Sequence, residues 1–318
     1  MRPYIPHDEG SRSPADLRLT RDDGTAVALT WRAFGRRDDL DLDFRSEART
    51  RLVTELLARC RHDAPGDIST RLAEARRLTL SGRIGGLAVI LARTLSSSDL
   101  IVELTCPREE CQSALQVSLA LASLVEMSQQ AERERSITIR LSDVESVHVR
   151  RPTGDDQHAW QSGHYQTIET AERAMVESLL VDGGPLSPAM LTAIDTALEE
   201  SDPLTCFRIT TVCPTCAEES DYAVDLEAVL IARLYRAQRS LLHDIHRLAI
   251  RYGWSEDAIA SLPSWRRREY LDFLDRGDAW ATSRDCANRA GLRSSTKPSR
   301  KDRMCRYPRP VRHRRRSN

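Results

Sequence analysis

Hydrophobic positions along the chain follow one pattern twice: two alternating runs joined by a Cys-Pro turn, and then a helical run. Counted from the second cysteine of each turn, apolar or aromatic residues recur at the same offsets. The pairs at offsets six, eight, ten, thirteen and fourteen are Val117/Tyr222, Leu119/Val224, Leu121/Leu226, Leu124/Val229 and Val125/Leu230. Internal repetition bears directly on architecture. The pattern predicts a strand–turn–strand–helix unit at about 100–133 and again at about 206–236.

Periodicity outside these units predicts further elements. Helices are expected over 46–62, 68–78, 83–95, 155–161, 168–181, 188–200, 226–252, 256–261 and 265–275, and strands over 25–31, 136–141 and 146–150. The fold class is therefore α+β, with helices around two β-hairpins and a helical C-terminal extension. We expect an irregular N-terminal arm at 1–45, an α+β domain at 46–276 and a basic disordered tail at 277–318.

The two turns carry the candidate chemistry. Cys106 and Cys111 are separated by four residues, and Cys213 and Cys216 by two. Zn²⁺ takes four tetrahedral ligands, and such spacings let one tight turn present two thiolates. Neither turn can saturate the ion alone. The sequence therefore predicts one structural zinc ion per chain, bound by all four cysteines in a zinc-ribbon-like hub that joins two zinc-knuckle hairpins.

Other interpretations of the cysteines remain open at this point. A CxxC pair can be a redox motif, which requires a helix directly after the strand, whereas a second strand is expected after Cys216. Disulfides and unliganded cysteines are the remaining alternatives. His243 and His246 share one face of the predicted long helix, but no third ligand stands out in the sequence, so packing and hydrogen bonding are the favoured interpretation.

No motif points to catalysis. The sequence shows no nucleophile elbow, phosphate-binding loop or His-Glu zinc-hydrolase motif. A zinc ion held by four thiolates has no open position for water or substrate. We therefore expect a protein that is not an enzyme and has no small-molecule substrate.

Charge is unevenly distributed along the chain, although the formal net charge is zero. Residues 284–318 contain 13 basic and 2 acidic residues, so their formal charge is 13 − 2 = +11. This basic tail could bind nucleic acid or an acidic protein surface by charge alone. The short run Arg266–Arg268 is neutralised by nearby carboxylates and is interpreted as a solvated face.

The sequence also indicates a compartment. The first residues lack the apolar core of a signal peptide, and no apolar run is long enough to span a bilayer. Eight cysteines without an export signal favour a reducing cytoplasm, where paired cysteines more often bind metal. We expect a cytoplasmic protein without membrane insertion, in the host or producing cell.

The chain resembles the baseplate hub assembly chaperones of T-even-type phages, which recur in phage tail and contractile injection clusters. The resemblance covers about 80–276 and includes the first cysteine pair. Its three main stretches are the hairpin at 208–226, the run Val147–Asp155, and the run Leu242–Glu256 with its continuation Arg267–Leu271. The first cysteine pair departs from the family in having four intervening residues rather than two, and the arm and tail lie outside the match.

The resemblance implies a non-enzymatic protein that helps to assemble the baseplate of a contractile tail or tail-like injection particle. Its partners would be baseplate, hub or tail-tube proteins. A permanent baseplate component, incorporated in the particle, is one alternative. The other is a zinc-ribbon protein that binds nucleic acid through the basic tail.

Overall fold

The computed structural model describes residues 17–20, 26–45, 48–62, 66–140, 146–182 and 186–289. The chain divides into two units, Met1–Ser264 and Trp265–Asn318, which are described separately below. Helices and small antiparallel sheets are present together, so the expected α+β class is confirmed.

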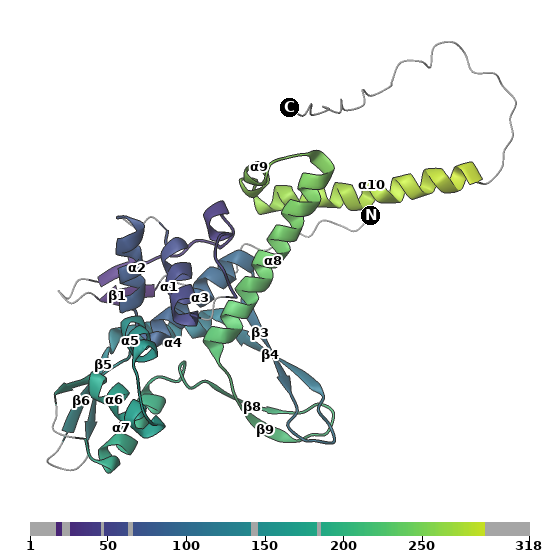
Figure 1. Cartoon of the computed structure of the whole chain (residues 1–318). Helices are drawn as coiled ribbons and strands as arrows, with labels where there is room; N and C mark the ends of the chain where they lie inside the picture. The colour runs from purple at the N-terminus through teal and green to yellow at the C-terminus, as the bar shows by residue number, and fades with distance from the viewer. Residues whose placement is uncertain are drawn as a thin grey trace, which may run out of the picture. The chain divides into compact units, whose positions relative to one another are not determined.

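The largest hydrophobic core among the described residues of the first unit is mainly helical (Figure 1). Its helices are α1 (Arg49–Arg59), α2 (Ile68–Arg77), α3 (Leu80–Leu95), α4 (Leu121–Arg133) and α8 (Leu226–Tyr252). Every residue of α3 from Ser81 to Ala92 is buried. A Cβ atom at Gly86 would lie 2.6 Å from Leu57 Cδ2, so glycine permits the close packing of α1 on α3.

The segment expected to be an irregular arm contributes to this core. Strands β1 (Leu17–Thr20) and β2 (Ala26–Leu29) form an antiparallel hairpin, and the short 3₁₀ helix η1 (Arg37–Asp39) follows. Trp31 is 1% exposed, and its indole N–H donates to the Leu57 carbonyl at 3.0 Å. Residues 30–44 are irregular apart from η1, as expected, but Trp31, Phe34 and Leu42 belong to the larger core, so this stretch is not a separate arm. The irregular spacing of these core residues produces no periodic signal. Residues 1–16 lie outside the described part of the chain.

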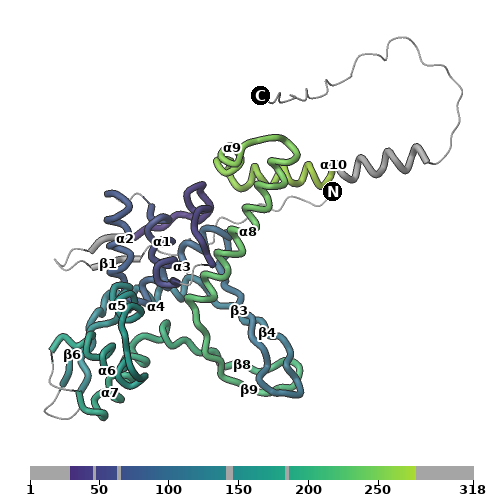
Figure 2. Tube along the Cα trace, in the orientation of Figure 1, coloured from purple at the N-terminus to yellow at the C-terminus, as the bar shows by residue number. Residues whose placement is uncertain are grey.

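A smaller core lies between the two cysteine hairpins in the sequence. Its elements are β5 (Ser136–Arg140), β6 (Ser146–Arg150), α5 (Gly154–Ser162), α6 (Ile168–Leu179), β7 (Leu180–Asp182) and α7 (Pro188–Ser201). The three strands form one antiparallel sheet in the order β5-β6-β7. Figure 2 shows α6 and α7 beside this sheet. The helix expected to reach residue 181 ends at Leu179, because Leu180 pairs with Val149.

Buried polar contacts join the smaller core to α3. The amide of Leu80 donates to the Pro152 carbonyl at 3.0 Å, which ties the start of α3 to the segment before α5. Asp202, at the end of α7, accepts a hydrogen bond from Ser81 and lies 3.5 Å from Arg151 Nη1. These contacts fix the end of α7 beside the start of α3.

The two repeated units form as the sequence predicts. The first consists of β3 (Asp99–Thr105), β4 (Ala114–Ala120) and α4, and the second of β8 (Arg208–Val212), β9 (Glu219–Ala223) and α8. Both strand pairs are antiparallel. The hairpins lie side by side in Figure 1, although they are far apart in the sequence.

The first unit ends after the long helix. Helix α8 stops at Gly253, whose φ of +68° lies in the left-handed region that favours glycine and whose amide donates to the Ala249 carbonyl at 2.8 Å. Helix α9 (Glu256–Ala260) follows, capped by Ser255. The described part of the second unit is helix α10, which begins at Ser264 and ends at Arg289.

Helix α10 corrects the expected start of the tail. It continues through Gly277, where periodicity is lost, because one glycine costs only about 1 kcal/mol relative to alanine and does not terminate a helix by itself. Residues 290–318 lie outside the described residues. Within the described part of the chain, every helix is too short or too polar to cross a membrane.

Candidate metal centre

The four predicted cysteines come together where the two hairpins turn. Cys106 follows β3 directly and Cys111 precedes β4, while Cys213 follows β8 directly and Cys216 precedes β9. All four sulfur atoms lie within 4.8 Å of one another. Residues from two distant parts of the sequence therefore form one four-thiol cluster.

The two turns share a backbone design. The amide of the first cysteine closes each hairpin: Cys106 donates to the Ser113 carbonyl at 2.9 Å, and Cys213 to the Glu218 carbonyl at 2.8 Å. Both acceptors stand two residues after the second cysteine. The residue directly after that cysteine has a positive φ in each turn, 45° at Gln112 and 57° at Ala217. The two additional residues of the first turn leave this closure unchanged.

Two sulfur–sulfur distances within the cluster match those of a tetrahedral metal site. The sulfur atoms of Cys106 and Cys216 are 3.7 Å apart, and those of Cys111 and Cys213 are 3.8 Å apart. Zn–S bonds of about 2.3 Å at tetrahedral angles place sulfur atoms about 3.8 Å apart. A disulfide would require about 2.05 Å. The cysteines are free thiols at a separation that a single metal ion would bridge.

Apolar side chains surround the cluster. Cys106 and Cys213 are 1% and 2% exposed, and Leu115 is buried beside them. Leu104 and Tyr222 pack against the same group, whereas Cys111 and Cys216 are half-buried. Each turn thus supplies one buried and one more accessible sulfur.

Hydrogen bonds make part of the cluster acidic. Backbone N–H groups of Cys216 and Thr215, together with the Ser113 hydroxyl, lower the pKa of Cys213 to about 6. The Ser113 hydroxyl also lies 2.8 Å from Cys111 Sγ and, with its backbone, lowers the pKa of that thiol. These contacts favour the thiolate, which is the form that binds metal.

Cys106 behaves differently in the metal-free cluster. A hydrogen bond from the Arg108 backbone lowers its pKa, but burial and donation to the neighbouring sulfur atoms outweigh this and raise it to about 12. The four thiols therefore share protons among themselves. A bound dication would displace those protons, because each ligand binds as a thiolate.

Sequence reasoning identified the four cysteines but missed Ser113 and the left-handed residues Gln112 and Ala217. A serine between a cysteine and a strand carries no distinctive signal, and neither glutamine nor alanine marks a positive φ. Only the fold shows that Ser113 reaches both halves of the cluster, since its hydroxyl is 3.6 Å from Cys213 Sγ.

The other candidates remain apart from this centre. His243 and His246 are exposed on α8, and the described residues contain no second group of three or more potential metal ligands.

Burial raises the pKa of Cys60 to about 12, as expected for a thiol in an apolar core. Arg266 lies over the Tyr270 ring within α10, 5.7 Å from its centroid.

Comparisons of the chain with protein-family models, with curated proteins and with solved structures found no match.

Proposed function

We propose that the chain binds one structural zinc ion through Cys106, Cys111, Cys213 and Cys216, and acts as a non-enzymatic assembly factor or structural component of a contractile-tail baseplate. The sulfur–sulfur distances of 3.7 and 3.8 Å are the observation that carries the zinc proposal. A tetrahedral four-thiolate set suits zinc or iron. Zinc is proposed because the site is closed and lies at the turns of two hairpins, as structural zinc sites do.

Zinc would act as a clamp between two distant parts of the sequence. Cys106 and Cys216 are 110 positions apart and belong to different hairpins. Structural zinc provides on the order of 10–16 kcal/mol of apparent binding energy. This is comparable to the net stability of a whole domain, about 5–15 kcal/mol. The ion would therefore hold both hairpins, and the segments that leave them, in one arrangement suited to protein–protein contacts.

The baseplate role rests on the resemblance. One of its stretches, Val147–Asp155, forms β6 and the start of α5, where Thr153 and Asp156 make a capping box. Another, Leu242–Glu256, forms the second half of α8 and the turn after it, where His243, His246 and Ile250 are exposed. Exposed polar and apolar side chains on one helix are consistent with a surface that contacts a partner protein.

Affinity capture from the native host, with and without nuclease, tests the proposal. We expect tail-tube, hub or baseplate subunits to be recovered under both conditions and to be identified by mass spectrometry. Metal analysis of the purified chain should give one zinc per chain, and the Cys213→Ser chain should lose both the zinc and normal particle assembly. Normal assembly by that variant would contradict the proposal. The presence of the chain in mature particles would indicate a permanent component rather than a chaperone.

The formal charge of +11 at 284–318 favours a second candidate, nucleic-acid binding through the tail. Such affinity should fall steeply with salt, because binding releases counterions from the phosphates. It should also disappear when residues 284–318 are deleted, whereas binding to a baseplate subunit should persist. A capture that contains only nucleic acid, or proteins lost with nuclease, would favour this candidate.

A further inference from the structure

A cleft with a volume of about 930 Å³ opens at the base of the second cysteine hairpin. Its walls come from the first turns of α1, α3 and α8, from α5, from the end of α7 and from the ends of β8 and β9. Cavities of about 300–1,000 Å³ are typical of ligand sites. This cleft lies where the smaller core meets the helical one.

Carboxylates outnumber cations in the lining. The charged residues that line the cleft are Arg49, Arg208, Glu199, Glu200, Asp225 and Glu227. Their formal sum is 2 − 4 = −2. An anionic ligand is therefore disfavoured, and a cationic one is favoured.

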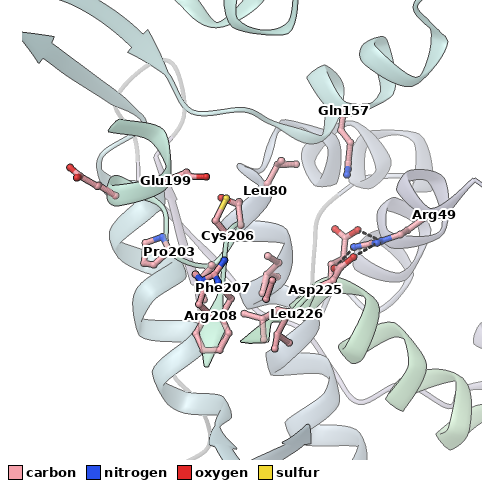
Figure 3. Close-up of a pocket in the computed structure, with 17 residues that line it drawn as sticks. Arg49, Leu80, Gln157, Glu199, Pro203, Cys206, Phe207, Arg208, Asp225 and Leu226 are labelled. Carbon is pink, nitrogen blue, oxygen red and sulfur yellow. Dashed lines mark hydrogen bonds and ion pairs between the residues drawn. The ribbon is translucent and has the colours of Figure 1, made fainter. Parts of the chain in front are cut away.

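Both arginines already have carboxylate partners. Arg49 binds Asp225 at 2.5 and 2.6 Å and Glu227 at 2.7 Å, and Arg208 binds Asp221 at 2.5 Å. Figure 3 shows Arg49 and Asp225 paired on one side of the cleft and Glu199 on the other. Glu199 makes no ion pair with any residue that the structure describes. The wall of the cleft that contains Glu199 therefore presents a carboxylate that no arginine or lysine of the described residues neutralises.

The pKa of the Cys206 thiol is shifted by the same negative charges. It is exposed and lines the cleft near Glu199. Burial raises the pKa of this thiol, and the negative charges of Glu199, Asp195 and Asp202 raise it further. The surroundings of the sulfur are thus electronegative, which is consistent with the excess of carboxylates.

The remaining lining is apolar. Ile84, Leu204 and Leu226 are buried at its base, and half-buried Phe207 lies among them. A small hydrated cation would leave this surface uncovered. A side chain that combines an aliphatic stem with a positive head, such as arginine or lysine, fits both features.

We propose that this cleft binds a basic segment of a partner protein, in which arginine or lysine alternates with apolar residues. In this arrangement the charged group of a partner arginine or lysine lies towards Glu199, and the apolar residues next to it in the partner segment cover Phe207 and Leu204. The charge and shape of the cleft favour such a segment, whatever the identity of the metal and whether or not the protein acts in a baseplate.

Protection of Cys206 provides a local test on the zinc-loaded full chain. The probe is an acetylated hexapeptide of alternating arginine and leucine, and the readout is the rate of Cys206 alkylation by N-ethylmaleimide. Peptide-resolved mass spectrometry separates Cys206 from Cys286 and Cys305. We expect the peptide to slow this alkylation several-fold. Fluorescence anisotropy of the labelled peptide measures binding even if the thiol stays accessible.

Matched variants locate the contact. Glu199→Lys should weaken peptide binding about ten-fold or more, since it places a like charge against the peptide. Glu126→Lys, on an exposed part of α4 outside the cleft, makes the same charge change and should leave binding unchanged. Circular dichroism of both variants verifies folding. Equal binding by the wild type and Glu199→Lys would overturn the proposal.

Three further results would also overturn it. One is the absence of any peptide binding by both readouts. Another is equal protection by a glutamate–leucine hexapeptide or by spermidine, which would show that basic side chains on a peptide are not what the cleft selects. The third is faster Cys206 alkylation on deletion of 290–318, which would identify the chain's own tail as the occupant. None of these results bears on baseplate assembly, which is measured separately by capture.

Discussion

The two cysteine hairpins have the same turn design but different support. In β3–β4, Leu100, Val102 and Leu115 are buried, and the first two belong to the larger core. In β8–β9, Ile209 is the one buried strand residue, and the cleft opens at the hairpin's base. The first hairpin is therefore held by core packing along its length. The second hairpin contributes only Ile209 from its strands to the same core, so metal binding should matter more for it.

Metal removal should produce the largest difference in stability between the two hairpins. Chelation removes on the order of 10 kcal/mol of apparent binding energy. We expect amides of β8–β9 to lose hydrogen-exchange protection first, while those of β3–β4 keep more of theirs because their side chains stay packed. Exchange read by mass spectrometry, with and without chelator, measures this directly. Simultaneous loss of protection in both hairpins would show that their supports are equal.

Substitution of single cysteines provides the matched control. Cys213→Ser should reproduce the effect of the chelator on β8–β9. Cys206→Ser changes an exposed thiol seven positions earlier and outside the cluster, so it should retain one metal ion and native protection. Loss of metal from Cys206→Ser would contradict the assignment of ligands.

Truncation of one core residue in each hairpin should give the next largest difference, measured as the loss in the free energy of unfolding. Leu100→Ala removes a fully buried side chain and should lower the free energy of unfolding by about 2–5 kcal/mol. Ile209→Ala should cost about 2 kcal/mol in the metal-bound protein, at the low end of that range, because Ile209 is more exposed than Leu100. Urea denaturation measures both values. A cost for Ile209→Ala equal to that of Leu100→Ala would show that the second hairpin is also held by its core.

The helices that follow the hairpins differ in how they begin. Ala120 precedes α4 without a side-chain cap, whereas Asp225 caps α8 by accepting from the Ala228 amide at 3.0 Å. Burial raises the pKa of Asp225, but the hydrogen bond from Arg49 and the backbone bond from Ala228 outweigh it and lower the pKa overall. Asp225→Ala should therefore cost about 1 kcal/mol at pH 7, close to the usual value of an N-cap.

The pH dependence of that cost follows from the lowered pKa. The unfolded chain binds the proton more tightly, so the stabilisation by Asp225 is present above its unfolded pKa of about 3.9 and is lost as the pH falls through the lower folded pKa. The difference between the wild type and Asp225→Ala should shrink below about pH 4. Equilibrium unfolding of both proteins at pH 7 and at pH 3.5, under the same metal conditions so that metal release cancels from their difference, tests this. A difference that grows on acidification would contradict the sign.

Much of this comparison was available from the sequence. Equal offsets of Val117 and Tyr222, and of Leu121 and Leu226, predicted both repeats, because strand and helix periods are local properties. Ligand spacing predicted the cluster. Non-local features were missed. Trp31 enters the core from an aperiodic segment, and three-residue β7 forms only because Leu180 meets Val149. The cleft likewise results from tertiary contacts between distant segments.

The smallest expected effect tests whether the two turns are true copies. Gln112 and Ala217 occupy the left-handed region, which costs a residue with a Cβ atom roughly 1–2 kcal/mol. Replacing either by glycine removes that strain but adds about 0.5–1 kcal/mol of conformational entropy to the unfolded chain. Gln112→Gly and Ala217→Gly should therefore each stabilise the metal-bound protein by about 0.5 kcal/mol, measured by urea denaturation. Equal gains would show that both backbones meet the same strain although the first turn is longer. Destabilisation by either variant would show that its turn does not keep the shared geometry in solution.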